Sequence, residues 1–84
     1  MSQLTNLPNI GKILEKQLNT VGIKTIEDLK EIGSKEAWLK IREIDDSACY
    51  NRLCGLEGAI QNIRWFDLSD KDKKDLKDFY QFCK

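Results

Sequence analysis

The chain of 84 residues has no histidine, a single proline and no long apolar run. Without histidine it lacks the commonest general base and metal ligand, and its three cysteines, Cys49, Cys54 and Cys83, contain no C-x-x-C pair. We therefore expect no metal site and no cofactor, and we expect the cysteines to be buried thiols that pack as small apolar side chains. Because a membrane-spanning helix needs about 18 or more consecutive apolar residues, none is expected.

Two further signals are missing from the sequence. The N-terminus has no basic segment followed by an apolar one, as a secretory signal would have, so we expect a cytoplasmic location. The chain also has no Ser-His pair, no phosphate-binding P-loop and no paired carboxylates that suggest a cleft. Since a small helical bundle rarely encloses a substrate, we expect a protein that is not an enzyme.

Neither sign of charge is in excess: 14 lysines and arginines balance 14 aspartates and glutamates. A dedicated DNA-binding protein usually has a high isoelectric point and a basic face, so the balance argues against one. The distribution is uneven, however. Residues 1–24 hold three lysines against one glutamate, whereas residues 25–47 hold four basic residues against seven acids. The charge pattern therefore leaves room only for a local basic patch near the N-terminus.

The chain is organised around residues 7–29, where glycine-containing turns separate short amphipathic segments. Pro8 forces the residue before it into an extended or turn conformation, and Asn9 and Gly11 suit a tight turn. A helix of about ten residues is expected to follow, because apolar residues recur at helical spacing. These residues are Ile10, Ile13, Leu14 and Leu18. Gly22 is expected to end this helix in a left-handed conformation, with Ile23 making the accompanying apolar contact.

Capping signals predict two more helices in the first half of the chain. Thr25 and Asp28 are spaced as a capping pair for a helix that stops at Gly33. Ser34 is expected to be the N-cap of the next helix. The residues expected to share one face of that helix are Ala37, Trp38, Ile41 and Ile44.

The longest apolar stripe lies in the second half of the chain and predicts the central core helix. Its members are Cys49, Leu53, Leu56, Ile60 and Ile63. Gly55 and Gly58 each cost this helix about 1 kcal/mol relative to alanine, which suggests close helix packing at these positions. Ser69 and Asp72 are spaced to cap a last helix, whose apolar face holds Leu76, Phe79, Tyr80 and Cys83. No strand-like alternation occurs, so we predict an all-α fold: a compact bundle of about five short helices.

These residues resemble the C-terminal domain of the TfoX/Sxy family of competence regulators, in order and spacing, over about residues 4–77. The match rests on Leu7 to Lys12, Val21 to Ile23, Thr25, Glu27 to Leu29, Glu36 to Trp38, Leu53, Leu56 to Ala59, Ile63, Trp65, Asp67 and Leu68. The resemblance implies that residues 1–84 form a single helical domain with a helix-hairpin-helix-like N-terminal half. In the family this domain usually follows an N-terminal α/β domain, and full-length members are linked to transcriptional control of DNA uptake. Because only the C-terminal unit is matched, the resemblance does not assign that regulatory role directly.

The turn at residues 7–11 supports a first hypothesis, a small regulatory module that contacts nucleic-acid backbone without reading sequence. Backbone N–H groups at a helix start suit an anion, and neighbouring lysines can reach further phosphates. The candidate residues are Asn9, Gly11, Lys12, Lys16 and Lys24. Helix-hairpin-helix motifs most often have glycine where Asn9 stands, which argues against close approach of a partner and for a purely structural turn.

The rival hypothesis is a protein–protein adapter with no nucleic-acid binding, using an apolar patch around Trp38 or the C-terminal helix. Trp38 and Trp65 can serve as stacking platforms for bases, but their place at the edge of apolar stripes favours packing in the core or at its rim. Glu57 stands in an apolar segment. A structural role is favoured for it, such as a hydrogen bond to a backbone group near Trp65, over simple exposure to solvent.

Overall fold

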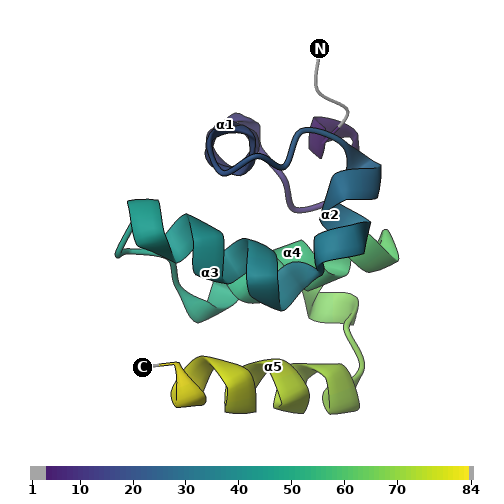
Figure 1. Cartoon of the computed structure of the whole chain (residues 1–84). Coiled ribbons are helices and arrows are strands. Elements are labelled where there is room, and N and C mark those ends of the chain that lie inside the picture. The colour runs from purple at the N-terminus through teal and green to yellow at the C-terminus, as the bar shows by residue number, and fades with distance from the viewer. Residues whose placement is uncertain (1–3, 84) are drawn as a thin grey trace.

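The computed structural model describes residues 4–83 and contains no strand within that range (Figure 1). Its helices are η1 (Leu4–Asn6), α1 (Lys12–Thr20), α2 (Ile26–Ile32), α3 (Ser34–Ile44), α4 (Tyr50–Gln61), η2 (Trp65–Asp67) and α5 (Asp70–Phe82), where η denotes a 3-10 helix. The predicted all-α fold of about five short helices is confirmed. Its N-terminal half has the expected helix-hairpin-helix-like order.

The helices form three layers, with α3 and α4 in the middle (Figure 1). The N-terminal elements η1, α1 and α2 lie on one side of this layer, and α5 lies on the other. Helix α4 packs against α2, α3, α5 and η2, and the side chains of Leu53, Leu56 and Ala59 are fully buried. The apolar stripe therefore does identify the central core helix.

Local capping signals give the helix ends correctly at three places. Thr25 Oγ1 accepts a hydrogen bond from the backbone N–H of Asp28 at 3.0 Å, and Ser69 Oγ accepts one from the N–H of Asp72 at 3.1 Å. After α1, Gly22 adopts a left-handed φ of 93°, and the N–H of Ile23 donates to the carbonyl of Leu18 at 2.8 Å. This is the expected C-terminal motif, with both apolar partners buried.

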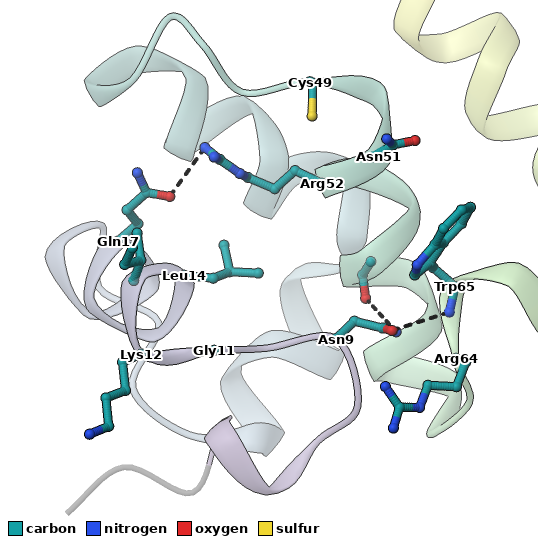
Figure 2. Close-up of a pocket in the computed structure, with 12 residues that line it drawn as sticks. Asn9, Gly11, Lys12, Leu14, Gln17, Cys49, Asn51, Arg52, Arg64 and Trp65 are labelled. Carbon is teal, nitrogen blue, oxygen red and sulfur yellow. Dashed lines mark hydrogen bonds between the residues drawn. The ribbon is translucent and has the colours of Figure 1, made fainter.

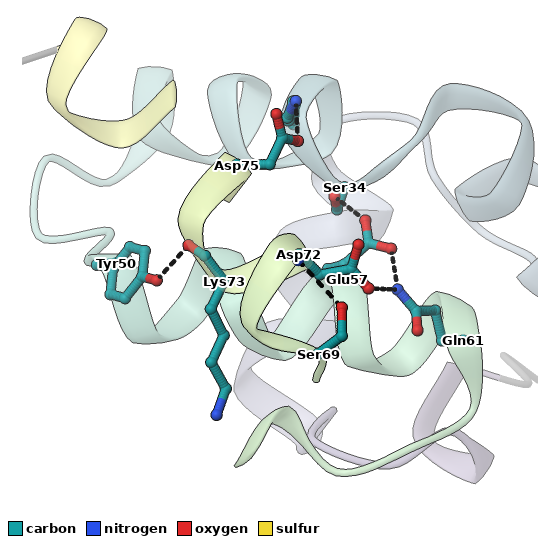
Figure 3. A network of polar contacts seen from close by, with 9 residues as sticks. Ser34, Tyr50, Glu57, Gln61, Ser69, Asp72, Lys73 and Asp75 are labelled. Carbon is teal, nitrogen blue, oxygen red and sulfur yellow. Dashed lines mark hydrogen bonds and ion pairs between the residues drawn. The ribbon is translucent and has the colours of Figure 1, made fainter. Parts of the chain in front are cut away.

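Ser34 is not the N-cap of α3, contrary to the prediction. Gly33 occupies that position with a φ of 87°, and Ser34 is the first helical residue. Its buried hydroxyl donates to Glu57 Oε1 at 2.6 Å (Figure 3). The prediction failed because the partner of this hydroxyl lies 23 positions away and competes with the local cap.

Glu57 has a structural role, but not beside the backbone near Trp65. Its second carboxylate oxygen accepts a hydrogen bond from Gln61 Nε2 at 2.6 Å, and the same Nε2 donates to Asp72 at 3.0 Å. Figure 3 shows this chain of polar contacts running from the start of α3 across α4 to the start of α5. The hydrogen bonds of Glu57 and Gln61 therefore connect α3, α4 and α5 at one end of the bundle.

The burial of several apolar residues differs from expectation. Ile13 is 77% exposed and Ile44 is 50% exposed, because α1 and α3 each bury a narrower face than their apolar spacing indicates. Cys54 is buried, and this burial raises the pKa of its thiol. Cys49, however, is exposed at the start of α4, so the expectation of buried thiols is wrong for this residue.

The two tryptophans have different environments. Trp38 is fully buried, donates from Nε1 to the carbonyl of Cys49 at 3.2 Å and meets Phe79 and Tyr80 edge to face. The ring of Trp38 itself therefore lies inside the core and does not contribute to a surface patch. Trp65 is 44% exposed, since the left-handed Asn62 ends α4 before the chain reaches it.

No helix within residues 4–83 combines the length and the apolar character needed to cross a bilayer.

Candidate nucleic-acid interface

Asn9 is the residue that attaches the turn at residues 7–11 to the rest of the molecule. Its backbone is left-handed, with a φ of 71°. Its Nδ2 donates to the carbonyls of Ile63 at 3.0 Å and Gly55 at 3.3 Å. Its Oδ1 accepts from the N–H of Trp65 at 3.2 Å, a contact that can be followed in Figure 2. The amide therefore points inward, and it ties the turn to α4 and to the start of η2.

The two glycines of α4 make this attachment possible. A Cβ added at Gly58 would lie 2.7 Å from Asn9 Nδ2 and 2.8 Å from the carbonyl oxygen of Ile63, closer than real Cβ atoms approach. At Gly55 the added Cβ would lie 3.5 Å from Asn9 Cβ, an ordinary contact. The predicted close packing is thus present, but its partners are the turn at residues 7–11 and the backbone of Ile63 and Trp65.

The first turn of α1 presents backbone N–H groups at the surface. Gly11 is its N-cap, is exposed and offers no side chain, so no side-chain hydrogen bond caps this helix. The first N–H groups of a helix have no intrahelical acceptor and carry partial positive charge. Lys12 and Lys16 are both exposed and stand four residues apart, on the same face of α1. The start of α1 therefore combines helix N–H groups and two lysines with one acid, Glu15, in its first turn.

An open groove of about 750 Å³ lies beside this helix start, between α1, the first half of α4 and the Arg64–Trp65 segment (Figure 2). Three basic side chains line it, from Lys12, Arg52 and Arg64, and none of its lining residues is acidic. Figure 2 shows Lys12 and Arg64 near opposite ends of the segment from Asn9 to Gly11, with Lys12 extending outward. The groove is therefore electropositive in a chain of zero net charge.

Arg52 belongs to the wall of the groove. Its Nη1 donates to Asp45 Oδ2 at 3.0 Å and to Gln17 Oε1 at 3.3 Å, and Gln17 Nε2 donates to the same carboxylate at 2.8 Å. Hydrogen bonds from Ser47, Arg52 and Gln17, in that order of effect, hold the pKa of Asp45 well below its usual range. Arg64, by contrast, is exposed and makes no ion pair with any residue from 4 to 83.

The structure brings together only part of the predicted site. Asn9, Gly11 and Lys12 line the groove, and Lys16 continues its basic edge along α1. Lys24 lies beyond the far end of α1, which at nine residues is about 13 Å long, and its N–H donates to Asp28 Oδ2 at 3.4 Å.

Two basic residues of the groove, Arg52 and Arg64, were missed from the sequence. The sequence admits Trp65 as a stacking platform, but it favours packing in the core or at its rim for this residue. Asn62 is the signal that could have revealed the positions of Arg64 and Trp65, because asparagine readily takes the left-handed conformation that ends a helix. Recognising this stop would have placed Arg64 and Trp65 in the following loop and not on the apolar stripe of α4.

The sequence matches the TfoX C-terminal domain over residues 1–80. The chain belongs to this family. It is 39% identical over 61 residues to Protein Sxy of Escherichia coli K12, a match that covers 73% of the chain and 29% of the length of Sxy.

The fold is also found in two crystal structures from Listeria monocytogenes. One, in a triclinic form, is of an uncharacterized protein that is 52% identical to this chain. The match has a TM-score of 0.93 and covers 95% of this chain and 91% of the Listeria chain. The other, in a tetragonal form, is of a protein of unknown function that is 51% identical. This match has a TM-score of 0.94 and covers 98% of this chain and 100% of the Listeria chain.

Proposed function

We propose that this TfoX C-terminal domain is a small regulatory module that contacts nucleic-acid backbone without reading sequence. One observation carries the proposal: a groove with no acidic lining residue, whose Lys12 and Arg64 make no ion pair with any residue from 4 to 83, adjoins the first turn of α1, which no side chain caps. The third basic residue of the groove, Arg52, is paired with Asp45. Phosphate is the anion that such a surface favours, since helix N–H groups and cationic side chains act on it together. None of these groups selects a base in duplex DNA.

The contacts follow from the positions of the groups. One phosphate lies at the N–H groups of the first turn of α1, within reach of Lys12. Lys16 follows on the same helix face, and Arg64 serves the other end of the turn. Asn9 acts as a positioning residue, because its amide is used in hydrogen bonds within the protein. At about 3.4 Å per nucleotide along one strand, the length of α1 corresponds to about four phosphates, so Lys24 reaches only an outlying one.

The regulatory part of the proposal comes from the relationship to Sxy, a protein of the competence-regulator family. The matched segment spans 29% of Sxy. We therefore propose for this chain only the contact with nucleic-acid backbone, and not the regulatory activity of the whole protein.

Binding to duplex DNA across a series of salt concentrations tests this function. The site variant is Lys12→Glu/Lys16→Glu/Lys24→Glu. The matched control, Lys71→Glu/Lys74→Glu/Lys77→Glu, makes the same change of charge on the exposed surface of α5. We expect salt-dependent binding by the wild type and by the control, and its loss in the site variant. Absence of binding at low salt, or equal loss in both variants, would contradict the proposal.

A second candidate, a protein–protein adapter, is favoured by one observation: Phe82 at the end of α5 is 88% exposed. The residue lies on the C-terminal helix, the surface that the adapter hypothesis uses. Light scattering over a concentration series and capture of partners with wild type and Phe82→Ser test it. The adapter hypothesis would be contradicted if the protein is a strict monomer and the wild type captures no partner that Phe82→Ser fails to capture.

A further inference from the structure

Trp65 is an exposed aromatic side chain in the wall of the electropositive groove. The residue is 44% exposed, whereas Trp38, the other tryptophan, is fully buried. Among residues 4–83 its one aromatic contact is T-shaped, with the ring of Phe66, with 5.7 Å between centroids and an interplanar angle of 83°. No aromatic ring of these residues is therefore stacked in parallel on the indole, and the exposed part of Trp65 adjoins the groove.

The position of Trp65 is set by the same residue that holds the turn. Its backbone N–H donates to Asn9 Oδ1 at 3.2 Å, and Asn9 is two residues before the N-cap of α1. Arg64 precedes it, and Figure 2 shows the two side chains diverging, with Arg64 on the side of the turn and the indole beside α4. An exposed aromatic side chain, a cation with no ion pair among residues 4–83 and a helix start therefore surround one groove.

We propose that this groove binds a single-stranded segment of nucleic acid, with an unpaired base stacked on Trp65. The flanking phosphates lie at Arg64 and at the first turn of α1. This inference rests on the proposed function and narrows its ligand from nucleic-acid backbone in general to an unpaired strand.

The reason for single strands is that a duplex hides the faces of its bases. Base–aromatic stacking needs an unstacked base, and proteins that bind single strands combine aromatic side chains with a basic groove in this way. The groove volume of about 750 Å³ lies within the range of roughly 300–1,000 Å³ typical of small-molecule sites, so there is room for a base with its sugar. An acidic peptide matches the charge but has no flat base to place on the indole.

The experiment measures the binding of a ten-nucleotide oligo(dT) and of a ten-base-pair duplex that contains the same strand, by fluorescence anisotropy at low salt. Trp65→Ala removes the platform and Trp65→Phe keeps a smaller one. Phe82→Ala removes an aromatic side chain on α5 that is more exposed than Trp65 (88% against 44%) and does not line the groove, and it serves as the control. Thermal melting by circular dichroism checks that each variant is folded.

We expect the wild type to bind the single strand more tightly than the duplex. Trp65→Ala should weaken single-strand binding by about 5- to 150-fold, the loss of one stacked base, and leave duplex binding unchanged. Trp65→Phe should keep most of the affinity, and Phe82→Ala all of it. Titration with oligo(dT) should quench the emission of Trp65, while the buried Trp38 supplies a constant background in Trp65→Phe.

The outcomes separate this inference from the function on which it rests. Equal, salt-dependent binding of both nucleic acids that is indifferent to Trp65→Ala overturns the stacking inference and leaves the proposed function standing. No binding of either at low salt overturns both. If polyglutamate competes as well as oligo(dT) and its binding falls equally in Trp65→Ala, the groove is a peptide site and the inference is wrong.

Discussion

At the scale of single residues, Gly58 shows how a costly residue in a helix is retained by tertiary contact. Glycine costs a helix interior about 1 kcal/mol relative to alanine, so Gly55→Ala, whose new Cβ makes an ordinary contact at 3.5 Å, should be neutral or stabilising by up to that amount. Gly58→Ala places a Cβ 2.7–2.8 Å from two polar atoms and should destabilise by about 1–3 kcal/mol in spite of the same gain. Urea unfolding of the two variants measures the difference.

This pair of glycines is its own control, because both stand in α4 and both receive the same methyl group. Equal effects of the two substitutions would show that helix propensity dominates and that the Asn9 contact does not restrict position 58.

Single residues also show where reasoning from the sequence succeeds. Thr25, Ser69 and Gly22 were predicted correctly because their partners lie within five positions along the chain. Ser34 and Asn9 were not predicted in their observed roles, since their partners lie 23 to 56 positions away. Periodicity and capping rules predict only contacts between residues that are close together in the sequence.

At the scale of elements, α4 carries the core and should be the most sensitive helix. Leu56 is fully buried, so Leu56→Ala should cost about 2–5 kcal/mol, which threatens a domain of this size. Ile13→Ala on α1, where the side chain is 77% exposed, should change the stability by less than about 0.5 kcal/mol. Chemical denaturation of both variants tests the assignment, and a small loss at Leu56 would contradict it.

The contact between α1 and the α3–α4 junction should depend on pH. Asp45 accepts hydrogen bonds from Gln17, Arg52 and Ser47, which lower its pKa in the folded state. A lowered pKa means that its stabilisation is complete above the unfolded value of about 3.9 and is lost as the pH falls below it. Asp45→Asn should therefore be less stable than the wild type at pH 7, and the difference should shrink between about pH 4 and pH 2.

Denaturation midpoints of the two proteins, measured from pH 7 down to pH 2, check this sign. Asp46→Asn is the matched control, because this exposed neighbour has the same charge and is not part of the network. A gap between wild type and Asp45→Asn that stays constant over the whole range would contradict the assignment.

The elements themselves were more predictable than the site. Helix types and approximate bounds follow from apolar spacing, and the core stripe of α4 is as expected. The groove depends on how α1, α4 and the Arg64–Trp65 segment approach one another, which no single element encodes. Asn9, Gly11 and Lys12, which line the groove, were nevertheless among the residues predicted for the site, because their turn chemistry is local.

At the scale of the whole molecule, zero net charge limits how strongly nucleic acid can be held. The first turn of α1 with Lys12, together with Lys16 and Arg64, accounts for about two or three phosphates. The logarithm of the binding constant should therefore fall against the logarithm of salt concentration with a slope of about −1.5 to −3. Anisotropy titrations between about 20 and 200 mM salt measure this slope. A slope steeper than about −5 would require a much larger basic surface than the groove.

The hydrogen bonds of Asn9 also bear on how the domain is made. They join the turn to positions 55, 63 and 65, so during synthesis the turn at residues 7–11 acquires its native shape only after residues 55–65 have also left the ribosome. A fragment ending at Gly33 would keep the whole hairpin motif and lose these three bonds. If residues 7–33 were grafted onto another protein without α4 and the segment after it, the motif would keep its sequence but would lose the geometry of the turn.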